Sequence, residues 1–253
     1  MTRRPAAPLG PPRTALVVGG TGGIGAAVIR ELAPSCERII FTYGSQADAA
    51  RDLERELDGA GASVRTIRAD LTDSAAWEAT LGSLVESEPI DLLVNAAGVS
   101  DDALCIDVDT ERFARQYQVN VTAPWIAMRV LARDMAYHRR GRIINVASIA
   151  ATVNSPGRSV YASTKAAIVS LTKSFAVEVG RFGIRVNAVA PGFVETPMIE
   201  DFDETTRKAF TDQVPLGRFA TAEEVARVVG FLAGENAEYL HGTVVTVDGG
   251  TSA

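Results

Sequence analysis

The sequence predicts an α/β protein built on one doubly wound parallel sheet of about seven strands, with helices on both faces. From residue 14 onward, short β-branched runs alternate with longer segments of helical periodicity, which is typical of a parallel sheet wrapped by helices. Several of the short runs are apolar throughout, as expected where helices cover both faces of a sheet. Because large α/β sheets often form one domain, 253 residues predict a single domain.

The strands and helices follow from these runs in chain order. Two segments, residues 47–57 and 160–179, have the apolar spacing of helices. Residues 194–217 interrupt the alternation with a polar stretch after a strand, where long loops commonly close over ligands. Residues 1–13 are proline-rich and lack a long apolar stretch, so we expect a flexible tail before a single domain at 14–253. The expected strands are residues 14–18, 38–42, 63–68, 91–94, 141–146, 184–189 and 243–247.

Composition narrows the classes of partner. The chain is 47% hydrophobic and 22% charged, which predicts a packed core. Its net charge of −6 argues against binding to nucleic acid or to a membrane surface. No apolar run is long enough to span a membrane. Cys36 and Cys105 lie far apart and in no metal-ligand spacing, so we expect no disulfide, no metal and a cytoplasmic location.

A glycine loop follows the first expected strand. Residues 19–25 read GGTGGIG, and a helix is expected to begin near Ala26, which is the context of a dinucleotide-binding turn. Gly19 would permit the sharp turn, Gly23 would leave room for a pyrophosphate, and Gly25 would let helix and strand approach. A purely structural turn would show the same glycines, so the loop alone does not decide the function.

Tyr161 and Lys165 stand four residues apart in an expected helix, so their side chains share a face. A nearby ammonium lowers the pKa of a phenol, which would make Tyr161 a usable acid or base. Taken alone, the pair also fits a surface tyrosine beside a solvated lysine. Ser148 favours the catalytic interpretation of this pair, because it follows the strand at 141–146, at a sheet edge where ligands bind. An isolated Ser148 would be an ordinary helix cap, and residues 95–98 (NAAG) could likewise be a plain strand-ending turn.

Together these motifs resemble the short-chain dehydrogenase/reductase family from Thr14 to Gly250. The resemblance implies a Rossmann-like fold and a homotetramer, with Tyr161 as general acid/base and Ser148 polarising a substrate carbonyl. It further implies that Lys165 binds the nicotinamide ribose and that Asn120 supports a water relay. The matching motifs are Gly19-x3-Gly23-x-Gly25, Asp70-Leu71, Asn95-Ala96-Ala97-Gly98, Asn120, Ser148, Tyr161-x3-Lys165 and Pro191-Gly192.

The resemblance also implies a set of cofactor contacts. Asp70 would face the adenine, Gly98 would lie near a ribose, and the backbone after Pro191 would meet the carboxamide. Val18 departs from the family, which often has a threonine there, and this should weaken a hydrogen bond within the loop. The expected contacts are Gly19, Thr21, Gly22, Gly23, Ile24, Gly25, Thr42, Ser45, Asp70, Leu71, Asn95, Ala96, Ala97, Gly98, Tyr161, Lys165, Pro191, Gly192, Val194 and Thr196.

The end of the second expected strand predicts NADP(H) over NAD(H). No carboxylate stands there to repel a 2′-phosphate, and the hydroxyls of Thr42 and Ser45 could receive it. Gly22 and Gly44 occupy places where NADP-specific members often carry Arg or Lys, so the expected preference is modest.

The most similar members are the 3-oxoacyl-[acyl-carrier-protein] reductases of fatty acid and polyketide synthesis, through residues 141–148, 190–198, 214–218 and 247–250. This implies NADPH-dependent reduction of a 3-oxoacyl thioester on an acyl carrier protein. Arg139 and Arg181 would dock the acidic carrier beside the pocket mouth, although either arginine also fits a solvated helix end.

Two alternatives stay open. The substrate could be a free alcohol, a sugar or another small ketone, or the chain could bind NADP without catalysis. Enoyl reduction is disfavoured because that branch of the family usually separates its Tyr and Lys by six residues, and here three residues separate them.

Overall fold

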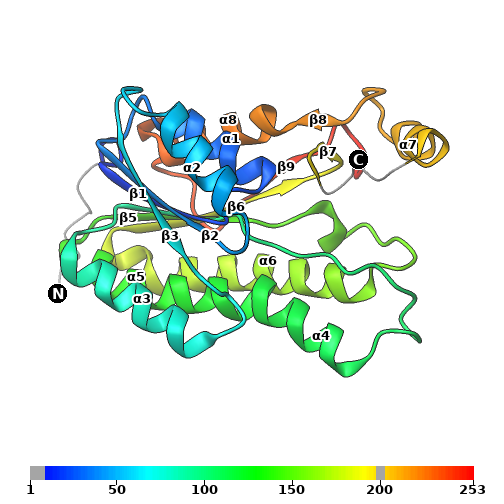
Figure 1. Ribbon diagram of the computed structural model, residues 1–253, viewed down its shortest axis with the longest axis horizontal. Helices are drawn as coiled ribbons and strands as arrows, with labels where there is room; N and C mark the ends of the chain where they lie inside the picture. Colours follow the sequence, from blue (N-terminus) through cyan, green and yellow to red (C-terminus); the bar gives the residue numbers. More distant parts are fainter. Residues whose placement is uncertain (1–8, 198–202) are drawn as a thin grey trace.

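The computed structural model describes residues 9–197 and 203–253 (Figure 1). All seven main strands are parallel, in the order β3-β2-β1-β4-β5-β6-β9. The chain order therefore reverses between β1 and β4, which is the switch point where ligands bind in open α/β sheets. The predicted fold class is confirmed. The strands are β1 (Thr14–Val18), β2 (Arg38–Tyr43), β3 (Ser63–Arg68), β4 (Leu92–Asn95), β5 (Gly141–Val146), β6 (Ile184–Pro191) and β9 (Val244–Val247).

Helices cover both faces of this sheet. In Figure 1, α1, α2 and α8 lie on one side of the strands, and α3, α4, α5 and α6 lie on the other. The carboxyl ends of the strands point toward the side of the molecule that holds β7, α7 and the C-terminus. The main helices are α1 (Gly23–Leu32), α2 (Ala47–Glu56), α3 (Ser74–Ser87), α4 (Thr110–Tyr117), α5 (Ala123–His138), α6 (Ser159–Val179), α7 (Glu204–Thr211) and α8 (Ala222–Ala233).

The inner strands are buried on both faces, and the side chains of β1 alternate between two cores. Ala15 and Val17 of β1 pack in the core shared with α1, α2 and α8. Leu16 and Val18 pack in the opposite core, with residues of α3 and α5. This two-sided burial explains why an inner strand such as β1 is almost entirely apolar, whereas the edge strand β3 is partly exposed and carries polar residues.

One strand, β6, extends two residues beyond its predicted end, whereas the bounds of the other main strands differ from the prediction by at most one residue. β6 continues to Pro191 because Ala190 and Pro191 pair with Thr246 and Val247 of β9. Proline lacks an N–H, so it is tolerated here as the last residue of the strand. The extension carries Pro191 and Gly192 to the edge where the cleft opens.

Residues 9–13, which we expected in a flexible tail, pack against the body. Leu9 is 2% exposed, and the Arg142 guanidinium donates hydrogen bonds to the carbonyl oxygens of Leu9 (3.3 Å) and Gly10 (2.9 Å). Arg142 is itself buried, so these carbonyls, together with the Gly234 carbonyl oxygen at 3.4 Å and the Glu238 carboxylate at 4.0 Å, compensate its desolvated charge. Residues 1–8 of the expected tail lie outside the described residues.

The predicted loop at 194–217 contains regular structure. A short strand, β7 (Val194–Glu195), pairs with β8 (Ala220–Thr221), and α7 occupies part of the stretch between them. Residues 198–202 of this segment lie outside the described residues.

The described residues also bear on three expected absences. Cys36 is buried, Cys105 is exposed, and both are free thiols. No group of His, Cys, Asp and Glu among residues 9–197 and 203–253 is arranged to hold a metal ion. Across the same ranges, no helix has the length and apolarity required to cross a bilayer.

Candidate active site

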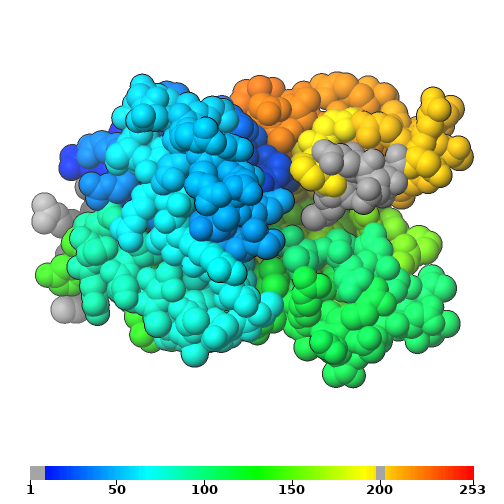
Figure 2. Space-filling view, in the orientation of Figure 1, coloured from blue at the N-terminus to red at the C-terminus, as the bar shows by residue number. Residues whose placement is uncertain are grey.

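A cavity of about 630 Å³ opens at the carboxyl ends of the strands, at the switch point between β1 and β4. In Figure 2 a furrow separates the blue and cyan atoms of the N-terminal part of the chain from the green and yellow atoms that come later in the sequence. The glycine loop, the ends of β4 and β5, the start of α6 and the end of β6 contribute its walls. Residues distant in sequence therefore meet where the fold predicts a ligand.

The glycine loop has the tight geometry that its sequence predicts. Gly19 has φ +85°, and a Cβ there would lie 2.6 Å from the backbone of Ala97. A Cβ on Gly25 would lie 2.1 Å from the carbonyl oxygen of Gly19. A Cβ on Gly23 would meet the side chain of Thr196 at 2.7 Å. Each of these three glycines is thus required by close contact with the protein's own atoms, and the loop that they shape lines the cavity.

Thr42 has a different place from the one predicted. It is 2% exposed, and its hydroxyl accepts a hydrogen bond from Gly19 N–H at 3.1 Å. Its carbonyl oxygen accepts another from Gly20 N–H at 2.8 Å. Thr42 therefore holds the loop from the neighbouring strand, where the sequence has Val18 instead of the family's threonine. The expectation that its hydroxyl faces a 2′-phosphate is wrong, because the hydroxyl is buried and engaged with the loop.

The first turn of α1 is suited to an anion. Its N-cap, Gly22, offers no side-chain hydrogen bond, and the first turn holds no acidic residue. By contrast, Asp73, Asp109 and Asp203 cap the first turns of α3, α4 and α7. The uncapped N–H groups of α1 face a bare glycine loop, so phosphate oxygens are fitting acceptors. The residues present therefore fit a dinucleotide.

Tyr161 and Ser148 meet at the cavity, from α6 and from the end of β5. Burial raises the pKa of Tyr161, and a hydrogen bond with Ser148 acts in the opposite direction. The Ser148 oxygen also accepts from Ala150 N–H at 3.1 Å, so Ser148 is both the cap of a short 3₁₀ helix (Ile149–Ala151) and the partner of the phenol. The raised pKa keeps Tyr161 protonated at neutral pH, as a proton donor requires.

Lys165 lies on the same face of α6, with its ammonium nitrogen 5.6 Å from the centre of the Tyr161 ring. It is 5% exposed, donates to the Val146 carbonyl oxygen at 2.9 Å, and burial lowers its pKa to about 8. The sequence predicts that Lys165 depresses the Tyr161 pKa, but desolvation of the phenol outweighs such an effect here and the net shift is upward. The predicted proximity holds, whereas the predicted direction of the shift does not.

Asn120 lies in a π-helical turn (Gln118–Thr122) between α4 and α5, and it is 1% exposed. Its amide accepts from Val99 N–H at 2.8 Å and donates to the Val99 carbonyl at 2.8 Å and to the Thr164 hydroxyl at 3.1 Å. Asn120 therefore ties the loop after β4 to α6 beside Lys165. The sequence located Asn120 by resemblance, but no periodicity signals the π turn.

Most predicted contacts line this cavity, and four do not. Asn95 is buried and donates to the Asn145 side chain at 2.8 Å, while Asp70 accepts two hydrogen bonds from Thr72 at an exposed turn. Thr42, Asp70, Leu71 and Asn95 are outside the lining. Those that line it are Gly19, Thr21, Gly22, Gly23, Ile24, Gly25, Ser45, Ala96, Ala97, Gly98, Ser148, Tyr161, Lys165, Pro191, Gly192, Val194 and Thr196.

Sequence reasoning missed Arg115, Arg158 and Phe193, which also line the cavity. Arg158 stands three residues before Tyr161, so helical spacing could have placed it near the site. Arg115 and Phe193 come from α4 and from the turn after β6, and no local pattern points to them. None of the described lining residues is acidic.

Arg139 and Arg181 lie together, but away from this cavity. Arg139 donates to the Arg181 carbonyl oxygen at 3.4 Å, next to the residues that begin β5 and β6. Ser148 follows the opposite end of β5, and a six-residue strand is roughly 20 Å long. The two arginines therefore do not flank the cavity of their own chain, because they occupy the amino-terminal edge of the sheet.

Comparisons with known proteins agree with this geometry. A family model described as enoyl-(acyl carrier protein) reductase matches residues 19–252. A protein named 3-oxoacyl-[acyl-carrier-protein] reductase FabG from Vibrio cholerae is 35% identical over 239 residues, covering 94% of this chain and 96% of the relative. Its namesake from Pseudomonas aeruginosa is 35% identical over 240 residues, with the same coverage of 94% and 96%.

Solved structures share the fold as well. A short-chain dehydrogenase/reductase from Serratia marcescens is 36% identical with a TM-score of 0.89, covering 98% of this chain and 100% of that chain. A structure assigned to an NAD(P)-dependent gluconate 5-dehydrogenase from Beutenbergia cavernae, with bound NADP, is 32% identical with a TM-score of 0.89. It covers 94% of this chain and 96% of that chain.

Proposed function

From the premise that this chain belongs to the short-chain dehydrogenase/reductase family, we propose that it reduces a 3-oxoacyl thioester with NADPH. The thioester is carried on an acyl carrier protein, as the names of the similar reductases state for those proteins. Membership of the family supports the broader class, which is an NAD(P)-dependent oxidoreductase.

One observation supports ketone reduction above the rest. Ser148 and Tyr161 both line the cavity that the glycine loop also lines, and the Ser148 side chain lies close enough to lower the pKa of the Tyr161 phenol. Two hydroxyl donors beside one another can both reach a single carbonyl oxygen. An enoyl thioester also has a carbonyl oxygen, so the spacing of Tyr161 and Lys165, with three residues between them, is what favours a ketone over a carbon–carbon double bond.

The residues divide the chemistry in a simple way. The nicotinamide, when bound, supplies the hydride that reaches the carbonyl carbon. Ser148 holds the carbonyl oxygen, and Tyr161 donates its proton to that oxygen as negative charge develops. Lys165 lines the cavity and would bind the ribose hydroxyls, and Asn120 fixes the loop that carries Val99 against α6. We further propose that Asn120 supports the water relay that returns a proton to Tyr161.

The test is an assay of purified protein with NADPH and an acetoacetyl thioester, followed by the loss of absorbance near ~340 nm. We expect saturable oxidation of NADPH and a 3-hydroxyacyl product. Tight NADPH binding without turnover on any ketone would instead support a non-catalytic NADP-binding protein. Turnover on a free ketone or sugar and none on the thioester would favour the small-substrate alternative, for which the gluconate 5-dehydrogenase likeness is the support.

We also propose that NADP(H) is preferred over NAD(H), and the end of β2 provides the test. Gly44 and Ser45 line the cavity there, and a Cβ on Gly44 would have nothing within 4 Å. Gly44→Asp therefore introduces a carboxylate without a steric clash, where it would repel a 2′-phosphate. We expect kcat/KM with NADPH to fall about 10-fold or more relative to NADH, the scale of one like-charge contact.

Gly44→Asn is the matched control, since it adds the same bulk without the charge. A wild-type kcat/KM with NADH equal to or above that with NADPH would contradict the proposed preference. An unchanged ratio in Gly44→Asp would show that the 2′-phosphate binds elsewhere.

The partner and the assembly are part of the same proposal. We propose a cytoplasmic homotetramer that binds neither nucleic acid nor membrane. Docking of a carrier protein on Arg139 and Arg181 then requires a second copy of the chain, whose pocket faces this edge, because these arginines are remote from the cavity of their own chain.

A further inference from the structure

Beside the reacting hydroxyl of Ser148 lies a small chamber of about 40 Å³. It shares Ser148, Arg158 and Phe193 with the large cavity and extends away from the glycine loop. The chamber therefore lies on the substrate side of the site. Since one water needs about 10–15 Å³ by this measure, it has room for a group of roughly four heavy atoms.

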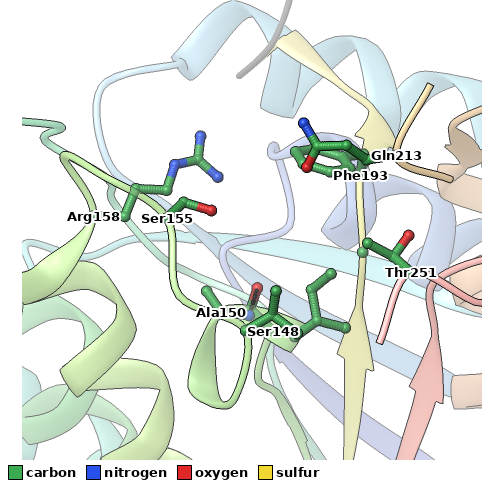
Figure 3. A pocket seen from close by; sticks show the side chains of 10 residues that line it. Ser148, Ala150, Ser155, Arg158, Phe193, Gln213 and Thr251 are labelled. Carbon is green, nitrogen blue, oxygen red and sulfur yellow. Dashed lines mark hydrogen bonds between the residues drawn. The ribbon is translucent and has the colours of Figure 1, made fainter. Parts of the chain in front are cut away.

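Arg158 is the charged residue of this chamber. Figure 3 shows its guanidinium on the same side of the chamber as Ser155 and facing the side chain of Gln213 across it. The Ser148 side chain lies below them (Figure 3). No described residue that lines the chamber is acidic, in a chain whose net charge is −6. Arg158 and the reacting side chain of Ser148 therefore line the same chamber, and no carboxylate is among its described lining residues.

The loop after β4 holds Arg158 in this position. Asp102 accepts from Nε of Arg158 at 2.9 Å, and Ala103 N–H donates to the Gly157 carbonyl oxygen at 2.9 Å. Asp102 is half exposed, so this ion pair orients the guanidinium more than it neutralises it. The pair uses Nε and leaves the two terminal nitrogens, which match a carboxylate in a bidentate pair.

We propose that Arg158 is a specificity residue that binds a carboxylate at the far end of a short 3-oxoacyl group. This inference rests on the proposed function for the ketone and the thioester, and it adds the class of acyl chain. The apolar walls from Ile149, Val153 and Phe193 would contact one or two methylenes between the ketone and the carboxylate. Longer, fully apolar chains fit the chamber poorly because of its size and its charge.

The test compares pairs of substrates that differ in one negative charge. The first pair is the N-acetylcysteamine thioester of 3-oxoadipate, with a free terminal carboxylate, and the terminal methyl ester of the same compound. The second pair, levulinate and methyl levulinate, keeps the spacing from ketone to carboxylate but has no thioester. Each pair is assayed with wild type, Arg158→Gln, Arg158→Lys and Arg112→Gln.

We expect wild type to prefer the carboxylate of each pair. Arg158→Gln should lower kcat/KM for the carboxylate about 10- to 100-fold, the range for a lost charged hydrogen bond. The ratio of kcat/KM for the carboxylate to kcat/KM for the methyl ester should fall by this factor, mainly through KM, because any loss through the charge that Arg158 contributes near Tyr161 affects both substrates alike. Arg158→Lys keeps the charge without the bidentate geometry and should retain part of the preference. Arg112→Gln removes the same charge from a neighbouring pair with Asp101 outside both cavities, and should change nothing.

Equal use of carboxylate and ester by wild type, or equal losses on both in Arg158→Gln, would overturn the inference. A preference that depends on Arg158 for levulinate, with no reduction of either thioester, would defeat the proposed function and keep the anion site. Reduction of both thioesters with no preference for the carboxylate would support the proposed function and rule out the anion site. If levulinate is not turned over, its effect on the fluorescence of bound NADPH measures binding, and absence of binding would count against the site.

Discussion

Tyr161→Phe is expected to abolish most turnover while leaving the fold and the affinity for NADPH nearly unchanged. Burial raises the pKa of the Tyr161 phenol, so it is the protonated donor at neutral pH, and phenylalanine keeps the ring but has no proton to give. A lost general acid costs about 10²-fold or more in kcat. The measurements are kcat on an acetoacetyl thioester, the dissociation constant for NADPH and the melting temperature.

Tyr117→Phe is the matched control. Tyr117 donates a hydrogen bond to the Ser163 hydroxyl at 3.1 Å, it is partly buried, and it is outside the lining of both cavities. The two variants remove the same hydroxyl from tyrosines at different places on the fold. Near-normal turnover in Tyr161→Phe would sink the catalytic assignment, and equal losses in the two variants would reveal a folding defect.

The inner strands of the sheet could be predicted from sequence because burial on both faces requires mostly apolar residues at consecutive positions. A strand such as β1 must be mostly apolar on each side, and residues 14–18 were bounded correctly for that reason. The end of β6 was not, since its last two residues are fixed by pairing with β9, which lies more than fifty residues further along the chain. Local pattern cannot report a pairing that the distant strand creates.

The catalytic residues were predictable for a different reason, namely their fixed spacing. Tyr161 and Lys165 share a helix face by periodicity alone, and Ser148 follows a strand end. Thr42 was misplaced because its position at the end of β2 said nothing about which way its hydroxyl turns. It turns to Gly19, since a buried hydroxyl needs a partner and the loop offers a free N–H.

Electrostatics could be predicted least well. The sequence places an ammonium near a phenol, but the sign of the pKa shift depends on how much water each group loses. Both groups are buried, so desolvation dominates: the pKa rises for Tyr161 and falls to about 8 for Lys165. Helical spacing could have placed Arg158 near Tyr161, but its ion pair with Asp102 and its effect on the Tyr161 pKa depend on a loop contact that no motif records.

Lys165→Met should damage cofactor binding and turnover together, in contrast to Tyr161→Phe. The substitution removes a donor for the ribose hydroxyls and the positive charge beside Tyr161, while methionine fills the same buried volume. We expect the dissociation constant for NADPH to rise about 10-fold, as for one charged hydrogen bond, and kcat to fall by about 10².

The pH profile tests whether Lys165 acts through its positive charge or only by filling buried volume. Burial lowers the Lys165 pKa to about 8, so the ammonium is present below that pH and is lost as the pH rises through it. In wild type, kcat/KM for NADPH should therefore decline on the basic side near pH 8. Lys165→Met has no ammonium to lose and should lack this limb, while Lys165→Arg should keep its charge and carry the activity that remains to higher pH. A Lys165→Met profile with the same basic limb as wild type would contradict the role of the ammonium, because the limb would then belong to another group.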